Sequence, residues 1–165
     1  MIEIANQIGA ALKLKGWMIA TAESCTGGGI AEAITAVPGC SAWFDRAFVT
    51  YSYEAKVEAL GVQQSSLNEY GAVSEQVVQE MARGALGHSR AHVAIAVSGI
   101  AGPAGGTLEK PVGSVWIAWA TRDSIDANGA LNSKVISKRY LFSGDREDVR
   151  QQTVVKALAE LLHNL

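Results

Sequence analysis

Cysteine and proline are scarce in this 165-residue sequence, which has two cysteines and three prolines. Cys25 and Cys40 are too few for a disulfide framework, and they do not form a CxxC pair. Apolar runs of the roughly 18 to 20 residues that cross a bilayer are also missing. Residues 1–4 lack the basic start and the apolar stretch of a signal peptide. We therefore expect a cytoplasmic protein with no membrane partner.

An excess of positive charge is missing as well. Lys and Arg number 14 against 16 Asp and Glu, which gives a net charge of -2, whereas a general nucleic-acid binder gathers phosphates with a basic field. We therefore expect no nucleic-acid partner. Hydrophobic residues make up 48% of the chain, which is enough to build a core, and the length suits a single domain over residues 1–165.

The order of the apolar segments predicts an α/β domain. Apolar residues at helical spacing predict helices over residues 2–15, 30–37, 75–87 and 145–162. Short β-branched and apolar runs predict strands over 17–22, 47–51, 91–98, 112–121 and 133–142, with a polar loop over 122–132. Helices alternate with strands up to Ser98, and two adjacent strands follow. We expect a three-layer α/β/α fold with a mixed, mostly parallel β-sheet that has an antiparallel edge.

Two glycine-rich segments each follow a predicted strand, at residues 21–29 (TAESCTGGG) and 98–106 (SGIAGPAGG). In open α/β sheets ligands bind beyond the carboxyl ends of the strands, where helix N-termini offer free N–H groups to anions. A turn without a ligand is the alternative interpretation. Neither segment matches GxGxxG or GxxxxGK[ST], which disfavours a dinucleotide fingerprint and a P-loop. The candidate substrate-binding residues here are Glu23, Cys25, Thr26, Gly27, Gly28, Ser98, Gly99, Gly102 and Gly105.

Ser24 lies between a predicted buried strand and a predicted helix start. One interpretation is a helix cap, a common role for serine. The other is a nucleophile next to helix N–H groups that hold a developing oxyanion, with Cys25 as the rival nucleophile. A serine nucleophile needs a base. Lys56 follows the second strand, so it emerges at the same sheet edge as Ser24; it is otherwise an ordinary solvated helix lysine. Lys110 is the competing lysine.

Arg146 and Arg150 lie four residues apart at the start of the last predicted helix and share a face of it. One interpretation is a surface pair that balances Asp145, Glu147 and Asp148. The other is a phosphate-binding or subunit-interface role. We expect no metal site, because HExxH is absent and the predicted helix end and strand start between the two nearest histidines separate them.

Six motifs occur together in one order along the chain. They are residues 21–28 (TAESCTGG), 48–52 (FVTYS), 54–56 (EAK), 71–75 (GAVSE), 98–103 (SGIAGP) and 110–113 (KPVG). With these motifs the sequence resembles the CinA C-terminal-domain family over about residues 3–163. The longer members of that family carry an additional N-terminal domain, for which 165 residues leave no room.

The resemblance implies an amidohydrolase that converts nicotinamide mononucleotide to nicotinate mononucleotide and ammonia, a step that recycles a pyridine nucleotide toward NAD. It implies a catalytic serine, lysine and tyrosine, which correspond here to Ser24, Lys56 and Tyr51. The resemblance calls for no cofactor. Two other functions stay open: a nucleotide-sensing module without turnover, and a DNA-associated competence factor, against which the acidic balance weighs.

Family members commonly self-associate, so the resemblance also implies a homodimer. Large aromatic side chains are the candidates for its buried contact area. They are Trp43, Phe44, Trp116 and Trp119.

Overall fold

A computed structural model describes residues 1–125 and 131–165. Its centre is a five-stranded sheet in the order β2-β1-β3-β4-β5. The strands are β1 (Ile19–Glu23), β2 (Phe44–Val49), β3 (Val93–Gly99), β4 (Ser114–Ile125) and β5 (Leu131–Leu141). The helices are α1 (Ile2–Lys15), α2 (Gly29–Thr35), α3 (Tyr53–Leu60), α4 (Gln64–Tyr70), α5 (Glu75–Gly87) and α6 (Arg146–Asn164), with a 3-10 turn, η1, at Cys40–Ala42.

The sheet is mixed, as the sequence predicts. β1 pairs in parallel with β2 on one side and with β3 on the other. β4 runs antiparallel to β3, and β5 runs antiparallel to β4. The carboxyl ends of β2, β1 and β3 therefore meet at one edge of the sheet, and the loops that leave these strands share that edge.

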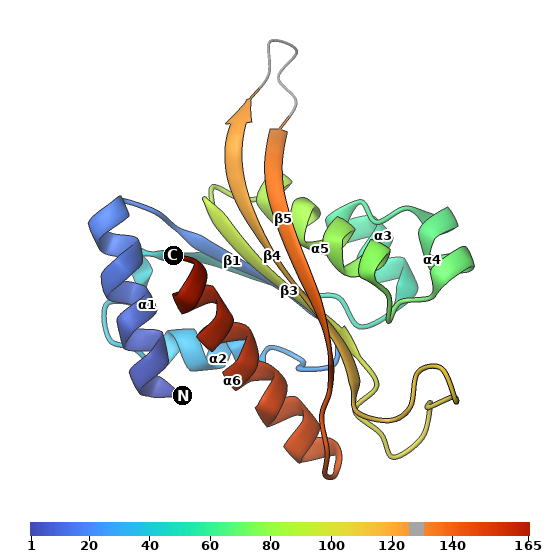
Figure 1. Cartoon of the computed structure of the whole chain (residues 1–165). Coiled ribbons are helices and arrows are strands. Elements are labelled where there is room, and N and C mark those ends of the chain that lie inside the picture. The colour runs from blue at the N-terminus through green and yellow to red at the C-terminus, as the bar shows by residue number, and fades with distance from the viewer. Residues whose placement is uncertain (126–130) are drawn as a thin grey trace.

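Two layers of helices cover the sheet (Figure 1). Helices α1, α2 and α6 pack on one face, and α3, α4 and α5 pack on the other. Strand β3 shows how the sequence serves both layers. Val93, Ile95 and Val97 face the first layer, whereas Ala94 and Ala96 face the second. Since alternate strand residues point to opposite faces, bulky side chains fill one core and alanines let α5 lie close on the other. The predicted three-layer α/β/α fold is confirmed.

Several element boundaries differ from the prediction. β2 begins at Phe44 rather than at residue 47, because the charged residues Asp45 and Arg46 are tolerated in an edge strand. Helices α3 and α4 are short and were not delimited from the sequence. The predicted polar loop 122–132 is wrong at both ends, where β4 and β5 continue as a ribbon that projects beyond the helices (Figure 1). Its middle, 126–130, lies outside the described residues.

Two of the four aromatic residues proposed for a dimer contact belong to the core of the chain itself. Trp43 has no exposed surface, and Trp119 is 3% exposed and donates its indole N–H to the Ala157 carbonyl at 2.9 Å. These two side chains cannot form a subunit interface. Phe44 and Trp116 are partly buried against the same cores.

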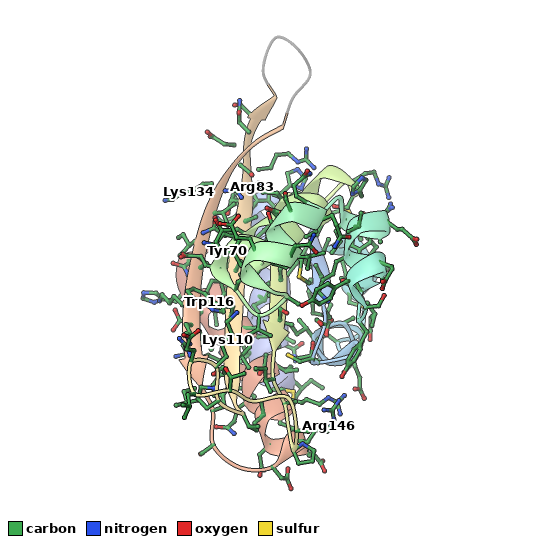
Figure 2. The ribbon with its side chains drawn as sticks, turned by 90° about the vertical axis from the view of Figure 1, so that its right-hand side faces the viewer. Tyr70, Arg83, Lys110, Trp116, Lys134 and Arg146 are labelled. Atoms are coloured by element: carbon green, nitrogen blue, oxygen red, sulfur yellow. The ribbon has the colours of Figure 1, made fainter. Side chains whose placement is uncertain are left out.

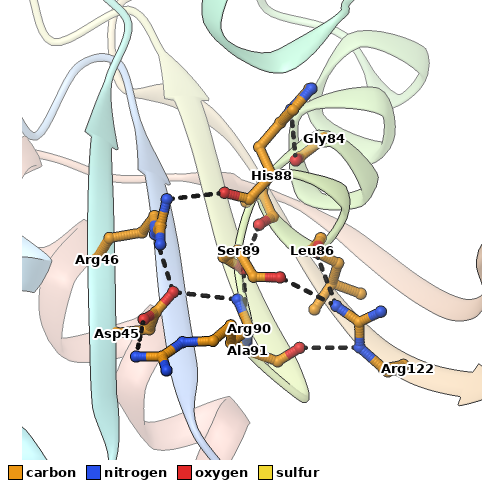
Figure 3. A network of polar contacts seen from close by, with 10 residues as sticks. Asp45, Arg46, Gly84, Leu86, His88, Ser89, Arg90, Ala91 and Arg122 are labelled. Atoms are coloured by element: carbon orange, nitrogen blue, oxygen red, sulfur yellow. Dashed lines mark hydrogen bonds and ion pairs between the residues drawn. The ribbon is translucent and has the colours of Figure 1, made fainter.

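The amino ends of β2 and β3 carry a closed polar network (Figure 3). Asp45 accepts bonds from the Arg46 side chain at 2.8 Å and from the Arg90 backbone at 3.1 Å. Arg122 donates to the carbonyl of Leu86 near the end of α5 and to the carbonyl of Ala91 before β3. The Asp45 carboxylate and the Arg122 guanidinium both have hydrogen-bond partners within the chain, so we assign this end of the sheet a structural role. Over residues 1–125 and 131–165, no helix is long and apolar enough to cross a membrane.

Candidate active site

Ser24 is the first residue after β1, held where the three parallel strands end. Its N–H donates to the Val97 carbonyl in β3 at 3.1 Å, and the Thr50 N–H donates to the Glu23 carbonyl at 2.9 Å. The chain then turns, with the Gly27 N–H donating to the Ser24 carbonyl at 3.1 Å. Ser24 is 8% exposed, so only a small part of it is open to a reacting group.

Lys56 comes from the first turn of α3, the helix that follows β2. This helix begins at a serine cap, Ser52, whose side chain accepts the Ala55 N–H at 3.1 Å. The lysine side chain has no exposed surface. Its ammonium nitrogen lies 3.1 Å from Ser24 Oγ, 2.7 Å from the Thr50 carbonyl and 3.2 Å from the Tyr51 carbonyl. The structure therefore joins the predicted serine and the predicted lysine.

The surroundings of Lys56 favour an amine that can act as a base. Burial lowers the pKa of Lys56 from 10.5 to about 8, because the charged form loses its hydration. A neutral amine has two N–H groups and one lone pair. The carbonyls of Thr50 and Tyr51 accept the two N–H groups, which leaves the lone pair for the Ser24 hydroxyl. This geometry suits proton transfer from serine to lysine.

Cys25, the rival nucleophile, lies in an environment that keeps it a thiol. Burial raises the pKa of Cys25 from 9.0 to about 12, and the nearby Glu23 carboxylate adds to the rise. The thiolate is the reactive form of cysteine, so Cys25 is inert at neutral pH.

Lys110, the competing base, lies elsewhere. Its amine donates to the Tyr70 carbonyl at the end of α4, at 2.6 Å, and Figure 2 labels the two residues near one another. It thereby ties the loop after β3 to α4, while Lys56 alone of the two lysines contacts Ser24. The sequence alone could not decide which of the two lysines is the base, because the acceptor of Lys110 is a carbonyl of α4, a helix that the sequence did not delimit.

Glu23, predicted to bind substrate, is fully buried, and both oxygens of its carboxylate accept hydrogen bonds from the chain itself. It accepts bonds from two threonine hydroxyls and three N–H groups around the start of α2. The donors are Thr21, Thr26, Gly28, Ile30 and Ala31. These contacts favour a structural role for the Glu23 carboxylate over the predicted substrate contact, and the α2 N–H groups that it occupies are not free to bind a phosphate.

The other predicted glycines divide between turns and packing. Gly27 and Gly28 have φ of 60° and 99°, a conformation that favours glycine in the tight turn after Ser24. A Cβ at Gly99 would lie 2.5 Å from Val115, so this glycine serves the contact between β3 and β4. Gly105 is exposed in the loop after β3. Strand contact explains Gly99 without a ligand.

A second set of predicted residues comes together beside the turn. Arg146 donates to the Gly102 carbonyl at 2.8 Å and to the Tyr51 hydroxyl at 2.9 Å. Arg150 donates to the Thr26 carbonyl at 3.0 Å. The Tyr51 side chain is 60% exposed, and its hydroxyl lies against Arg146, whereas its carbonyl contacts Lys56. Arg146 is the first residue of α6 and lies near the lower end of the view in Figure 2.

The two arginines line a cleft of about 710 Å³ between α2 and α6. Neither forms an ion pair with the acids at the start of α6 within the described residues. Asp145 and Asp148 instead form a capping box with the backbone of the helix. The carboxylates of Glu32, Asp145 and Glu147 also line the cleft, but neither arginine is tied to one of them in an ion pair of the described residues, so both guanidinium groups can still bind an anion.

Two buried hydroxyls flank Ser24 on the neighbouring strands. Thr50 follows β2, and Ser98 belongs to β3; each is at most 2% exposed. Within residues 1–125 and 131–165, the side-chain oxygen of each has no hydrogen-bond partner. Ser98 is a predicted site residue. Thr50 was not among the predicted site residues. Its contact with Lys56 is made by the backbone carbonyl, and a sequence pattern of side chains gives no sign of such a contact.

The part of the chain that the structure describes contains no group of three or more His, Cys, Asp or Glu that could hold a metal ion. His88 contacts the Gly84 carbonyl, and His92 accepts the Met18 N–H. The two histidines therefore serve the backbone around them.

A serine hydroxyl bonded to a buried lysine amine, at the strand ends of a three-layer α/β fold, suits a hydrolase that uses a serine nucleophile and a lysine base. The chain matches the CinA C-terminal domain over residues 1–165 and belongs to that family.

Relatives of known name and structure agree with this assignment. The chain is 56% identical to the nicotinamide-nucleotide amidohydrolase PncC of Enterobacter agglomerans over 97% of its length and 92% of the relative's. It is 52% identical to the protein of the same name from Escherichia coli K12, over 98% and 92%. A competence/damage inducible protein from Agrobacterium tumefaciens has the same fold, with 44% identity, a TM-score of 0.86 and coverage of 98% and 93%.

Proposed function

We propose that this protein hydrolyses the carboxamide of nicotinamide mononucleotide to give nicotinate mononucleotide and ammonia. The observation that carries the proposal is the contact of 3.1 Å between Lys56 Nζ and Ser24 Oγ, in a chain more than half identical to named nicotinamide-nucleotide amidohydrolases. An amide is a poor electrophile, and this pair supplies both an activated nucleophile and a proton donor.

In the first step Lys56 accepts the proton of the Ser24 hydroxyl, and Oγ attacks the carboxamide carbon. The N–H groups of Gly27 and Gly28 are already bonded within the chain. We therefore assign the developing oxyanion to the N–H groups of Cys25 and Thr26, which follow the nucleophile directly. Lys56, now an ammonium, has three donors for the Thr50 and Tyr51 carbonyls and the reacting atoms.

In the second step the C–N bond breaks. The Lys56 ammonium gives its proton to the leaving nitrogen of the tetrahedral intermediate, the carbonyl re-forms, and ammonia departs to leave an ester between nicotinate mononucleotide and Ser24. Lys56 is then neutral again and takes a proton from water, which attacks the ester. The carboxylate product leaves, and Ser24 recovers its hydroxyl.

Arg146 and Arg150 are the residues that we assign to the 5′-phosphate of the substrate. Their guanidinium groups lie in the cleft next to the Ser24 turn, and α2 offers no free N–H groups in their place. Ser98 and Thr50, whose buried hydroxyls find no partner among the residues that the structure describes, are assigned to the carboxamide end. Tyr51 contributes its carbonyl to Lys56, and its hydroxyl holds Arg146 beside the cleft.

We also propose that the enzyme acts in the cytoplasm as a homodimer. The two free cysteines suit a reducing compartment, where pyridine nucleotides are recycled. The interface would use residues other than Trp43 and Trp119. Light scattering coupled to size exclusion tests the dimer directly, and a monomer at micromolar concentration contradicts it.

The experiment that tests the function is an assay of ammonia release with nicotinamide mononucleotide, nicotinamide riboside and NAD as substrates. We expect turnover of the mononucleotide and much weaker turnover of the riboside. A nucleotide-sensing module would bind the mononucleotide and release no ammonia, and that result would overturn the proposal.

A further inference from the structure

The buried carboxylate of Glu23 is the most heavily bonded side chain near the site, yet it contacts neither Ser24 Oγ nor Lys56. One oxygen accepts the Thr26 hydroxyl at 2.6 Å and the N–H groups of Gly28 and Ile30 at 3.1 and 3.0 Å. The other accepts the Thr21 hydroxyl at 3.1 Å and the Ala31 N–H at 2.9 Å. Five donors converge on one carboxylate.

These donors lie on both sides of the turn that carries Ser24. Thr21 belongs to β1, before the turn, whereas the other four belong to the turn and to the first residues of α2. Glu23 is the last residue of β1. Its side chain therefore connects the end of β1 to the start of α2 across the turn. Ser24 is the first residue of that turn.

We infer that Glu23 is a positioning residue for the nucleophile, an inference that rests on the proposed function. The carboxylate accepts bonds from Thr26, Gly28, Ile30 and Ala31, which holds the turn in place and keeps Ser24 Oγ at 3.1 Å from Lys56 Nζ. A nucleophile displaced by about 1 Å loses on the order of 100-fold in rate. The carboxylate also takes the place of an anion at the start of α2, which directs the phosphate of the substrate to the arginines of the cleft.

Two threonines give a matched pair of tests. Thr21 and Thr26 are both buried and both donate a hydroxyl to Glu23, but only Thr26 lies in the turn. Thr→Val keeps the shape and removes one hydrogen bond in each case. We expect similar melting temperatures for Thr21→Val and Thr26→Val, with kcat unchanged in the first and lowered roughly 10-fold in the second, because only the second loses a hydrogen bond that holds the turn.

Glu23→Gln is the stronger variant, because an amide nitrogen cannot accept a bond from the N–H groups that face it. We expect kcat to fall by about 100-fold, with a much smaller change in KM. The reaction of Ser24 with phenylmethylsulfonyl fluoride, followed by mass spectrometry of the Ser24 peptide, provides a readout that needs no nucleotide. Its rate should fall in the same order, from Thr21→Val to Thr26→Val to Glu23→Gln.

The inference is overturned if the two threonine variants lose equal activity, or if Glu23→Gln keeps both its kcat and its sulfonylation rate. Should Glu23→Gln fail to fold, the threonine pair still decides. A wild-type enzyme that releases no ammonia, but whose variants follow the expected order of sulfonylation, would refute the proposed function and leave the positioning role of Glu23 intact.

Discussion

Two side chains of the nucleophilic type stand next to each other after β1, and their surroundings separate them. Ser24 has a base at 3.1 Å, whereas burial raises the pKa of the Cys25 thiol to about 12. The same burial that silences the thiol activates the amine, because both effects disfavour a charged form. At the residue scale, desolvation therefore assigns the roles.

The pH dependence of the reaction follows from Lys56. The base must be neutral, and burial lowers the pKa of Lys56 to about 8, so kcat/KM should rise with pH up to a plateau above that value. Lys56→Arg should be as inactive as Lys56→Ala, because a guanidinium keeps its proton at these pH values. Initial rates of ammonia release between pH 6 and 9.5 measure this, and a flat profile for the wild type would contradict the assignment.

The sequence predicts that Ser24 and Lys56 lie at one edge of the sheet, since both follow strands whose carboxyl ends meet, and the family resemblance implies that the two act together. It does not predict the groups to which the Glu23 carboxylate and the Lys110 amine bond, for a physical reason. Whether a charged side chain points toward a ligand or toward its own backbone depends on which N–H and C=O groups the fold leaves nearby. The α2 N–H groups and the Tyr70 carbonyl become visible only when the elements are in place.

At the scale of elements, the position of Lys56 depends on how α3 packs on α5. A Cβ at Gly84 of α5 would lie 2.0 Å from the Leu60 carbonyl at the end of α3. Gly84→Ala should push the two helices apart, lower stability by about 1–3 kcal/mol and reduce kcat. Urea unfolding and steady-state kinetics measure both effects.

Gly87→Ala in the same helix is the control, because a Cβ at Gly87 would have no neighbouring atom within 4 Å. It should leave kcat unchanged and change stability by no more than about 1 kcal/mol, in the favourable direction. Equal damage from the two substitutions would show that the close approach of α3 and α5 does not position Lys56.

The cleft between α2 and α6 should bind the phosphate of the substrate. Arg150→Ala should raise KM for nicotinamide mononucleotide roughly 10- to 150-fold, from ~1.5–3 kcal/mol for hydrogen bonds to a charged group, and leave the weak turnover of the riboside unchanged. Arg83→Ala removes an exposed arginine from α5 and serves as the control. An equal loss on both substrates would remove Arg150 from phosphate binding.

The long, strongly patterned elements are the ones that the sequence predicts. Helices α1, α5 and α6 and strand β3 agree with their predicted spans to within two residues. The short helices α3 and α4 carry too few turns for a clear period, and the β4–β5 ribbon is polar where it projects into solvent. A polar segment predicts a loop, but a two-stranded ribbon exposed to solvent on both faces can have the same polar composition.

At the scale of the whole molecule, the buried lysine should appear in the pH dependence of stability. Below about pH 8 the folded and unfolded states both keep the Lys56 proton. Between pH 8 and the ordinary value of 10.5, the folded state gives it up first. The free energy of unfolding of the wild type, relative to Lys56→Met, should therefore rise by up to about 3 kcal/mol over this range. Urea titrations at several pH values test it; a constant difference would contradict a lowered pKa.

The three-layer fold explains why the chemistry gathers at one end. Only the parallel half of the sheet brings three strand ends together, and Thr50, Ser24 and Ser98 stand at those ends. The opposite end of the sheet holds a closed network of charges, centred on Asp45 and Arg122, that serves the fold alone.

Ammonia release from nicotinamide mononucleotide at pH 8 by the wild type, Ser24→Ala and Cys25→Ala tests the central claim most directly. The account predicts release by the wild type, substantial release by Cys25→Ala, and none above background by Ser24→Ala. The Ser24→Ala protein should still fold and bind the nucleotide, because it loses only a hydroxyl. An active Ser24→Ala beside an inactive Cys25→Ala would make the thiol the nucleophile and contradict the Ser24–Lys56 mechanism.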